Sequence, residues 1–300
     1  MKKGWIVYNG YLNNKIVSQP VKWLYEKALQ EGIEIELKKN SELQSIYEGD
    51  KVGLLGFTRQ QLPDFVIFWD KDIGLAATLE KLGIKLYNSA RSIEICDNKA
   101  LTFQVLAGNG IKMPKTIVAP KTFEMIGYND TTYLDQILEE LKFPFVIKEC
   151  YGSLGEQVYM ASNEKEMKDI LGKINTKPHI FQEFIESSKG RDIRIQVVGS
   201  RIISAMYRYN KCDFRSNIAL GGTAKICVPT KEMEELALKS CKIIGLDFAG
   251  VDFLIGAENE PILCEINSNP NMIGLYESTG VNTAEHIIQY IIQDIKKQAI

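Results

Sequence analysis

The first ninety residues alternate short apolar runs with longer amphipathic ones. This pattern predicts helices at residues 21–30 and 72–82, and strands at 5–8, 33–37, 65–69 and 84–87. Strand and helix in turn are typical of a mostly parallel α/β unit. The loop at 9–14 follows the first strand, where open α/β sheets place their ligands. A solvated surface loop is an equally good interpretation of that segment.

The remainder of the chain changes character. Helices are predicted at residues 97–107, 134–141, 164–171, 231–244 and 283–297, and strands at 144–149, 158–160, 179–184, 192–198, 202–209, 250–254 and 263–267. Several of these strands follow one another through short turns, which favours antiparallel pairing. We therefore expect an N-terminal α/β domain at residues 1–95 and an α+β domain at residues 96–300.

Composition narrows the possible partners and locations. The 300 residues carry a formal net charge of −2, so a nucleic acid is a poor candidate for the main partner. No apolar run approaches the length of a membrane span, and the N-terminal run is too short for a signal peptide. The six cysteines form no C-x-x-C pair and there are only two histidines. We expect reduced thiols in a cytoplasmic protein, without a zinc site or a Ser/His triad.

Two adjacent strand segments near the C-terminus carry acids and an amide. If the turn at 256–260 centres between residues 258 and 259, Asp252 lies opposite Glu265, and Glu265 shares a strand face with Asn267. Two carboxylates that close repel, so one would take up a proton unless a cation lies between them. Mg²⁺ prefers such hard oxygen ligands, and its usual company is a polyphosphate. The opposite face is predicted to carry Ile262, Cys264 and Ile266.

A lysine and a glycine-rich loop follow the strand at 144–149. Lys148 ends the apolar part of that strand, and the loop contains Gly152, Ser153 and Gly155. Glycines let backbone N–H groups approach an anion, and a lysine adds a point charge, so the segment suggests a phosphate clasp. It is not a Walker loop, because no helix with Gly-Lys-Ser/Thr follows. A plain hairpin turn explains the same residues at roughly even odds or better.

A nucleobase could bind at the end of the next strand. The run Gln182-Glu183-Phe184-Ile185 offers backbone polar groups beside apolar side chains, which is what adenine needs. Taken alone, the run is better explained as a strand end that packs Phe184 into the core.

Five arginines lie between residues 191 and 215, although the chain has no net positive charge. Asp192 and Arg194 alternate with apolar residues, and a solvated polar face is the default interpretation. Arginine also suits phosphoryl and carboxylate groups, because its guanidinium is planar and always charged. A local anion site is therefore the second interpretation of Arg191, Arg194, Arg201, Arg208 and Arg215.

These segments together resemble the ATP-grasp superfamily, and within it the RimK-like glutamate ligases. The resemblance covers about residues 97–280 in the family's order. It rests on Asp97-Asn98-Lys99, residues 143–148, 152–155 and 182–185, Asp192-Ile193-Arg194, Asp213-Phe214-Arg215-Ser216-Asn217, Gly221-Gly222, residues 249–252 and Glu265-Ile266-Asn267-Ser268-Asn269-Pro270. It implies an ATP-grasp fold behind an N-terminal Rossmann-like (pre-ATP-grasp) α/β domain. A smaller lid subdomain is expected at about 110–184 and a C-terminal subdomain at about 185–300.

The resemblance also implies a role for each matching residue. Nucleotide binding would fall to Lys99, Lys148, Gly152, Ser153, Gly155, Gln182, Glu183, Phe184, Ile185, Asp192 and Ser216. Arg208, Arg215 and Asn217 would face the transferred phosphoryl group. Asp252, Glu265 and Asn267 would hold two Mg²⁺ ions, with Mn²⁺ as a substitute. Gln157 stands where many members have a further lid glycine, and Asn271 follows Pro270 where glycine is common.

The implied activity is ATP-dependent ligation of a carboxylate to an amine through an acyl-phosphate. The expected product is an amide of glutamate, or of a similar amino acid, with a peptide, a protein tail or a small metabolite. Relatives often assemble into dimers or tetramers. Two alternatives stay open: a non-catalytic Mg-ATP sensor or scaffold, and another ATP-grasp chemistry of the D-Ala–D-Ala or glutathione type. The run Asp213–Asn217 favours the RimK-like branch.

Overall fold

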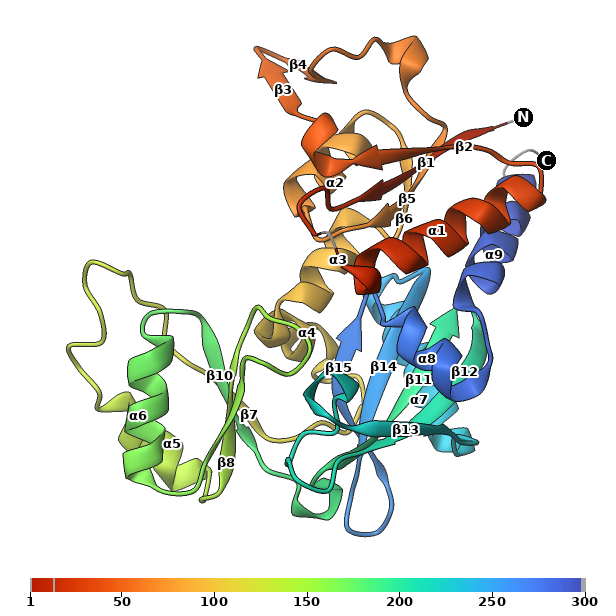
Figure 1. Ribbon diagram of the computed structural model, residues 1–300. Coiled ribbons are helices and arrows are strands. Elements are labelled where there is room, and N and C mark those ends of the chain that lie inside the picture. The colour runs from red at the N-terminus through yellow and green to blue at the C-terminus, as the bar shows by residue number, and fades with distance from the viewer. Residues whose placement is uncertain (1, 13, 298–300) are drawn as a thin grey trace.

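The computed structural model describes residues 2–12 and 14–297. Its N-terminal part is a four-stranded parallel sheet in the order β2-β1-β5-β6 (Figure 1). The strands are β1 (Lys3–Tyr8), β2 (Glu34–Lys39), β5 (Phe65–Trp69) and β6 (Lys85–Tyr87). All five residues of β5 are buried, because helices or loops cover both faces of this strand. The sheet confirms the predicted alternation of strand and helix.

The helices around this sheet begin where the sequence supplies a cap. Asn14 caps α1 (Lys15–Gln30), which starts earlier than predicted, and Asp72 caps α2 (Ile73–Lys81) by accepting from the Leu75 N–H. Two further strands, β3 (Ser45–Glu48) and β4 (Lys51–Leu54), form a hairpin that projects from the top of the molecule in Figure 1. They were not predicted.

The predicted helix over residues 97–107 is confirmed but begins two residues later than expected, and the helix that precedes it was not predicted. The structure has two helices, α3 (Ala90–Asp97) and α4 (Lys99–Leu106), separated by Asn98 in an extended conformation. The Asn98 side chain accepts from the Leu101 N–H and so starts the second helix. The break places Lys99 in the first turn of α4, which adjoins the glycine-rich loop.

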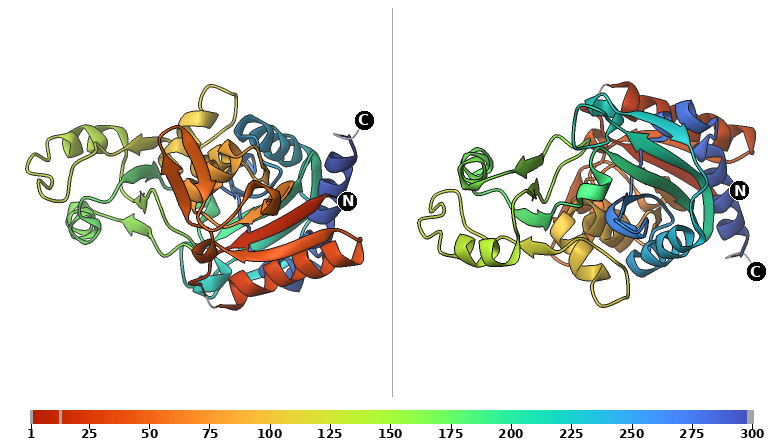
Figure 2. Two further views of the ribbon diagram at one scale, coloured as in Figure 1. Left: turned by 90° about the horizontal axis from the view of Figure 1, so that it is seen from above. Right: turned by 90° about the horizontal axis from the view of Figure 1, so that it is seen from below.

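A small antiparallel sheet forms a separate lobe, at the left of Figure 1 and of both views in Figure 2. Its order is β7-β10-β8-β9, with β7 (Thr116–Val118), β10 (His179–Glu183), β8 (Phe145–Glu149) and β9 (Val158–Ala161). Helices α5 (Tyr133–Glu140) and α6 (Glu164–Ile174) pack on it around a core of its own that includes Phe145, Phe181 and Met167. The lobe is therefore stabilised largely from within.

A five-stranded antiparallel sheet forms the third part, in the order β13-β12-β11-β14-β15. The strands are β13 (Thr223–Ile226), β12 (Arg201–Tyr209), β11 (Arg191–Val198), β14 (Phe248–Ile255) and β15 (Pro261–Asn267). Helices α7 (Lys231–Ile244), α8 (Met272–Thr279) and α9 (Thr283–Lys297) complete it. Helix α9 also lies against α1 and shares a core with the N-terminal sheet, so these two parts are joined by buried apolar residues (Figure 1).

A β-bulge sets the register of the β14–β15 hairpin. Asp252 pairs with Glu265, as predicted, whereas Phe253 pairs with Leu263, so Cys264 is the extra residue. The bulge turns Cys264 into the same cavity as Glu265, and Leu263 and Ile266 go to the core. The prediction that Cys264 takes the face opposite Glu265 is wrong, because strict alternation does not continue across a bulge.

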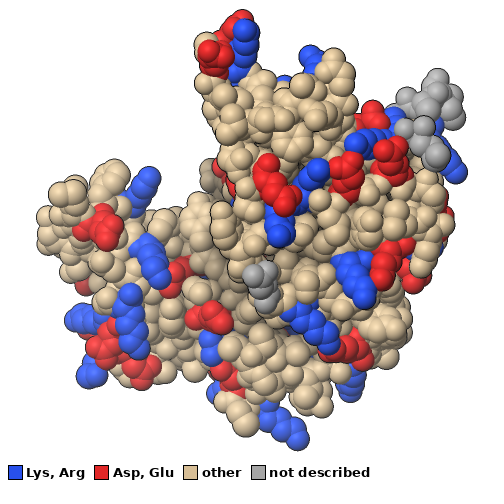
Figure 3. Space-filling model, turned by 45° about the horizontal axis from the view of Figure 1, so that its top comes forward, with Lys and Arg blue, Asp and Glu red and all other residues tan. Residues whose placement is uncertain are grey.

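The distribution of surface charge and the apolarity of the helices can be compared with the expectations from composition. Acidic and basic side chains are interspersed on the face that Figure 3 displays. None of the helices in the described ranges combines the length and apolarity that a bilayer crossing requires.

Candidate active site

One cavity lies between the small lobe, the first turn of α4 and the five-stranded sheet. Of the predicted site residues, all but Asn267 line it: Lys99, Lys148, Gly152, Ser153, Gly155, Gln182, Glu183, Phe184, Ile185, Asp192, Arg208, Arg215, Ser216, Asn217, Asp252 and Glu265. These residues come from segments more than 160 positions apart in the chain. The structure thus brings the predicted site together, while the role of each residue stays a prediction.

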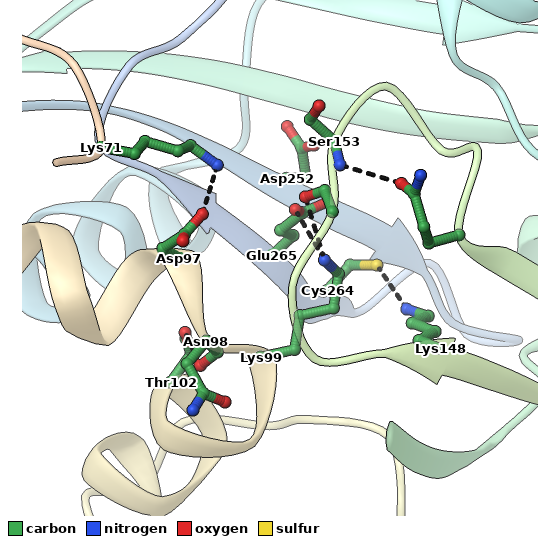
Figure 4. A network of polar contacts seen from close by, with 12 residues as sticks. Lys71, Asp97, Asn98, Lys99, Thr102, Lys148, Ser153, Asp252, Cys264 and Glu265 are labelled. Atoms are coloured by element: carbon green, nitrogen blue, oxygen red, sulfur yellow. Dashed lines mark hydrogen bonds and ion pairs between the residues drawn. The ribbon is translucent and has the colours of Figure 1, made fainter. Parts of the chain in front are cut away.

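Two buried lysines supply positive charge. The Lys99 ammonium lies 3.4 Å from the Gly152 carbonyl oxygen and 3.8 Å from a Glu265 carboxylate oxygen (Figure 4). Lys148 is 8% exposed, and its ammonium contacts the Cys264 sulfur at 3.6 Å. It forms no ion pair with any residue that the structure describes. A buried ammonium without a counter-charge is costly, so this position is suited to an anion.

The loop after β8 adopts conformations that favour glycine. Gly152 and Gly155 have positive φ angles of 153° and 81°. A Cβ atom at Gly155 would come within 2.7 Å of the Asn217 Oδ1. The Gln157 side chain accepts from the Ser153 N–H at 3.1 Å. The Gln157 side chain therefore stabilises the loop through a hydrogen bond within it. The departure from the family's glycine at this position did not predict that contact.

Arg215 joins the five-stranded part to the same loop. Its guanidinium forks onto Asp213, with Nη2 2.7 Å from Oδ2, and its Nη1 donates to the Gly155 carbonyl at 2.7 Å and to Val158 at 3.2 Å. The predicted phosphoryl contact of Arg215 stays a prediction. In this structure the side chain holds the loop against the sheet.

The predicted adenine segment lines the cavity at the end of β10. Gln182 is buried, and its Nε2 donates to the Thr116 hydroxyl at 2.8 Å. Glu183 Oε2 accepts from the Lys115 N–H at 3.1 Å, and Phe184 meets Phe214 edge to face at 6.1 Å. Polar groups and aromatic rings thus lie together here, as a nucleobase site needs.

A chain of buried ion pairs crosses the floor of the cavity. Asp192 accepts from Arg208 with both oxygens, at 2.7 and 2.5 Å, and Asp252 accepts from Arg194 with both oxygens at 2.6 Å. Arg208 Nη2 also reaches Asp252 at 2.9 Å and so links the two pairs. The interpretation of Asp192 and Arg194 as a solvated face is therefore wrong, because the sheet buries both.

These pairs decide the charge of Asp252. Burial alone would raise the pKa of its carboxyl, but Arg194 and Arg208 outweigh burial and lower that pKa. The expectation that one acid of the hairpin takes up a proton therefore fails for Asp252. The same contacts raise the pKa of Arg208 against the opposing effect of its burial.

The proposed metal ligands present hard oxygens to two adjoining cavities, with Asp252 in the first only. Glu265 lines both cavities, and Asn267 lines the second, with its Nδ2 buried and without a hydrogen-bond partner in the described part of the chain. Within residues 2–12 and 14–297, no three His, Cys, Asp or Glu side chains gather as a metal site. Two carboxylates and one amide fit Mg²⁺, which takes its remaining ligands from phosphates and water.

A second cavity of about 420 Å³ adjoins the first and reaches the N-terminal sheet. Ser153, Arg208, Asn217 and Glu265 line both cavities. Asn9, Leu12 and Asn14 of the loop after β1 line it, which agrees with one of the two interpretations of that loop, whereas Asp70 and Lys71 were missed as site residues. Asp70 and Lys71 directly follow a buried parallel strand, which was the available signal.

Comparisons with known proteins agree with this geometry. The chain is 31% identical to the uncharacterized protein MG012 of Mycoplasma genitalium, over 97% of this chain and 100% of that protein. It is 34% identical to N-acetylaspartylglutamate synthase A of Homo sapiens, over 74% of this chain. The match spans only 56% of the human protein's length.

The fold matches solved ATP-grasp enzymes. The ligase PsnB, solved in complex with a precursor variant, Mg and ADP, superposes with a TM-score of 0.69 over 98% of both chains, at 16% identity. A family profile described as the RimK-like ATP-grasp domain matches residues 96–291. The profile, the relatives and the shared fold together show that this chain belongs to the RimK-like ATP-grasp family of ligases.

Proposed function

We propose that this protein joins a carboxylate to an amine at the expense of ATP, releasing ADP and phosphate through an acyl-phosphate. The observation that carries the proposal is the pairing of two buried lysines, Lys99 and Lys148, with Glu265 and the loop 152–155 around one cavity. Buried ammonium groups suit a polyphosphate, and carboxylate oxygens suit the cation that accompanies it.

The nucleotide would lie across the cavity. Residues 182–185 would hold adenine and Asp192 the ribose, while Lys99 and Lys148 neutralise the phosphates. The loop with Gly152, Ser153 and Gly155 would cover the phosphates and exclude water, which otherwise hydrolyses an acyl-phosphate. Ser216 lines this cavity beside Asn217.

Asp252, Glu265 and Asn267 would hold Mg²⁺, or Mn²⁺, in two sites. When bound, the cations offset the charge that develops on the phosphates. Asp252 would bind the cation as a carboxylate, because its ion pairs with Arg194 and Arg208 keep it ionised.

The arginines would act on the transferred phosphoryl group. Arg208 uses Nε and Nη2 for its carboxylates, and its Nη1 makes no hydrogen bond with any described residue. That nitrogen is available for a phosphoryl oxygen. Arg215 and Asn217 lie at the same end of the cavity and would stabilise the same charge. Positioning and electrostatics, rather than covalent help from the protein, would then account for the rate.

The amino acid is proposed from the relatives. The name of the human relative contains glutamate, so we propose glutamate or a similar amino acid as one substrate, joined to a peptide, a protein tail or a small metabolite. A soluble cytoplasmic location and a homodimer or homotetramer are part of the same proposal.

Mg²⁺-dependent ADP release tests the proposal. The full chain is incubated with ATP, Mg²⁺ and pools of amino acids and carboxylates, and we expect ADP release that requires one acid and one amine. Binding of Mg-ATP without ADP release from any pool would favour a sensor or scaffold instead.

A pair of variants tests the metal role. Glu265→Gln removes a charge from the cavity and should abolish ADP release while the melting temperature stays near that of the wild type. Glu258→Gln changes an exposed glutamate in the β14–β15 turn and should leave the rate unchanged. Equal activity in both variants would remove Glu265 from the metal site.

A further inference from the structure

The second cavity contains an acidic group that the proposed reaction does not use. Asp70 follows β5 directly, at the carboxyl end of a parallel strand, and is only 7% exposed. Its carboxylate lines the second cavity and not the first. Parallel α/β sheets present ligand-binding groups at this end of their strands. Asp70 therefore lies where a substrate of the N-terminal part would bind.

The hydrogen-bond donors to Asp70 are neutral. Its Oδ1 accepts from the Asn9 amide at 3.2 Å and from the Lys71 backbone N–H at 2.8 Å. The Lys71 ammonium instead pairs with Asp97 at 2.5 Å (Figure 4). In the described parts of the chain, Asp70 makes no ion pair. This carboxylate is therefore buried without an ion-paired counter-charge, and the Lys71 charge acts on it only from a distance.

A buried carboxylate of this kind favours a cationic ligand. Burial raises the pKa of the Asp70 carboxyl, with a smaller contribution from Asp72, against the effect of its hydrogen bonds from Asn9 and the Lys71 N–H and of the Lys71 charge. A cation beside it would restore the balance of charge that the protein leaves open. A metal ion would lack a second free oxygen ligand from Asn9, because the Asn9 Oδ1 already accepts from the Tyr11 N–H at 3.0 Å. An ammonium group, which needs acceptors but no fixed coordination, fits better.

The rest of the cavity fits an amino acid. Its volume, about 420 Å³, lies within the range of small-molecule sites. Apolar side chains of Leu12, Val17 and Ile218 form part of the wall, and Arg208 lies at the junction with the first cavity. The wall thus contains the Asp70 carboxylate and, at the junction, the Arg208 guanidinium beside Glu265, so each charge of a zwitterion has a partner of opposite sign.

We propose that the second cavity binds an α-amino acid substrate whose ammonium group docks on the Asp70 carboxylate. The inference rests on the proposed function, because it assigns one of that reaction's two substrates to this cavity. Asp70 acts as a specificity-determining residue: it selects substrates that carry a primary ammonium group and rejects their uncharged or anionic counterparts.

The first test compares ligands on the unaltered protein. The full chain, with Mg²⁺ and a non-hydrolysable ATP analogue, is titrated calorimetrically with each of the twenty L-amino acids. Each one that binds is then compared with its des-amino counterpart, for example L-glutamate with glutarate. We expect at least one amino acid to bind, and its des-amino counterpart to bind about ten-fold more weakly or worse.

The second test changes the protein. Asp70→Asn keeps the shape and removes the charge, so it should weaken amino-acid binding about ten-fold or more and leave binding of the ATP analogue unchanged. Asp50→Asn, in the exposed turn between β3 and β4, is the matched control and should bind both ligands like the wild type.

The outcomes separate this inference from the proposed function. Equal binding of an amino acid and its des-amino counterpart, or undiminished binding by Asp70→Asn, overturns the role of Asp70 even if ADP release proceeds. Binding of the ATP analogue with none of the twenty amino acids also overturns it. Loss of the proposed function is read independently, as the absence of Mg²⁺-dependent ADP release from every pool.

Discussion

Arg194 holds both carboxylate oxygens of Asp252, with Nε 2.6 Å from Oδ1 and Nη2 2.6 Å from Oδ2. Arg208 adds a third contact, and all three side chains are buried in the five-stranded sheet. The proposed metal ligand is therefore kept ionised and oriented by the protein itself.

Asp252→Asn should destabilise the fold in a pH-dependent way. Losing the charge leaves two arginines partly unpaired in a buried site, at a cost of about 3–5 kcal/mol near neutral pH. The folded-state pKa of Asp252 lies below its usual 3.8, so the carboxylate's contribution is complete above that value and is lost as the pH falls below it. Urea unfolding should show a constant gap to the wild type from about pH 5 to 7, and a shrinking gap below about pH 4.

Asp169→Asn is the control for this prediction. Asp169 forms an exposed ion pair with Lys165 on α6, so the variant should lose less than about 0.5 kcal/mol. A gap for Asp252→Asn that keeps its size in acid would contradict the pairing described here.

Lys148→Met should separate binding from stability. The ammonium of Lys148 forms no ion pair in the described part of the chain, so an apolar side chain of similar length should keep or raise the melting temperature. Mg-ATP affinity should fall about ten- to a hundred-fold, because one charge-assisted contact to phosphate is lost. Calorimetry and thermal unfolding measure the two effects. Lys173→Met, on the exposed side of α6, should change neither, and unchanged affinity in Lys148→Met would remove this lysine from the nucleotide site.

Gly155→Ala should impair the loop over the cavity. The added Cβ would lie 2.7 Å from the Asn217 Oδ1, at a φ of 81° that alanine adopts only under strain. We expect turnover to fall about ten-fold, with a cost of about 1–2 kcal/mol in stability. Steady-state kinetics and urea unfolding test both.

Gly172→Ala is the matched change for that loop variant. Gly172 lies within α6, and its added Cβ would meet nothing within 4 Å, so alanine should stabilise the protein by about 0.5–1 kcal/mol and leave turnover unaltered. Similar kinetics in the two glycine variants would argue against a covering role for residues 152–155.

Arg215→Lys should reduce turnover about a hundred-fold, because lysine cannot reproduce the guanidinium fork that contacts Asp213 and the Gly155 carbonyl. The measurement is kcat with saturating ATP. Arg91→Lys alters an exposed pair with Glu94 and should have no effect. Near-normal rates for Arg215→Lys would reduce Arg215 to a structural contact.

Local sequence patterns predicted the helices and strands better than they predicted which side chains contact one another. The buried run of β5 and the amphipathic α7 and α9 were predicted with their observed bounds, because each pattern is long or strongly apolar. Helix α3 was missed, and the start of α4 was predicted two residues early because Asn98, and not Asp97, is its cap. The bulge at Cys264 was missed because a prediction from strict alternation of strand faces assumes that no extra residue interrupts the pairing.

The candidate site shows the same division. Sixteen of the seventeen residues predicted from the motifs line one cavity, and Asn267 lines the adjoining one. Pairing between strands decided the rest: Arg194 meets Asp252 only because β11 lies beside β14. Asp70 belongs to a part of the chain where the resemblance is weakest, so only its position after a parallel strand could have indicated it.

The position of α9 affects how this chain emerges from a ribosome. Ile287, Ile288 and Ile291 complete the apolar core beneath Ile6 and Leu24, although more than 260 residues separate the two groups. During synthesis, the nascent N-terminal sheet must therefore keep an uncovered apolar face until residues 283–297 have been translated. Chains that stop before α9 should accordingly be stronger substrates for chaperones than chains that include it.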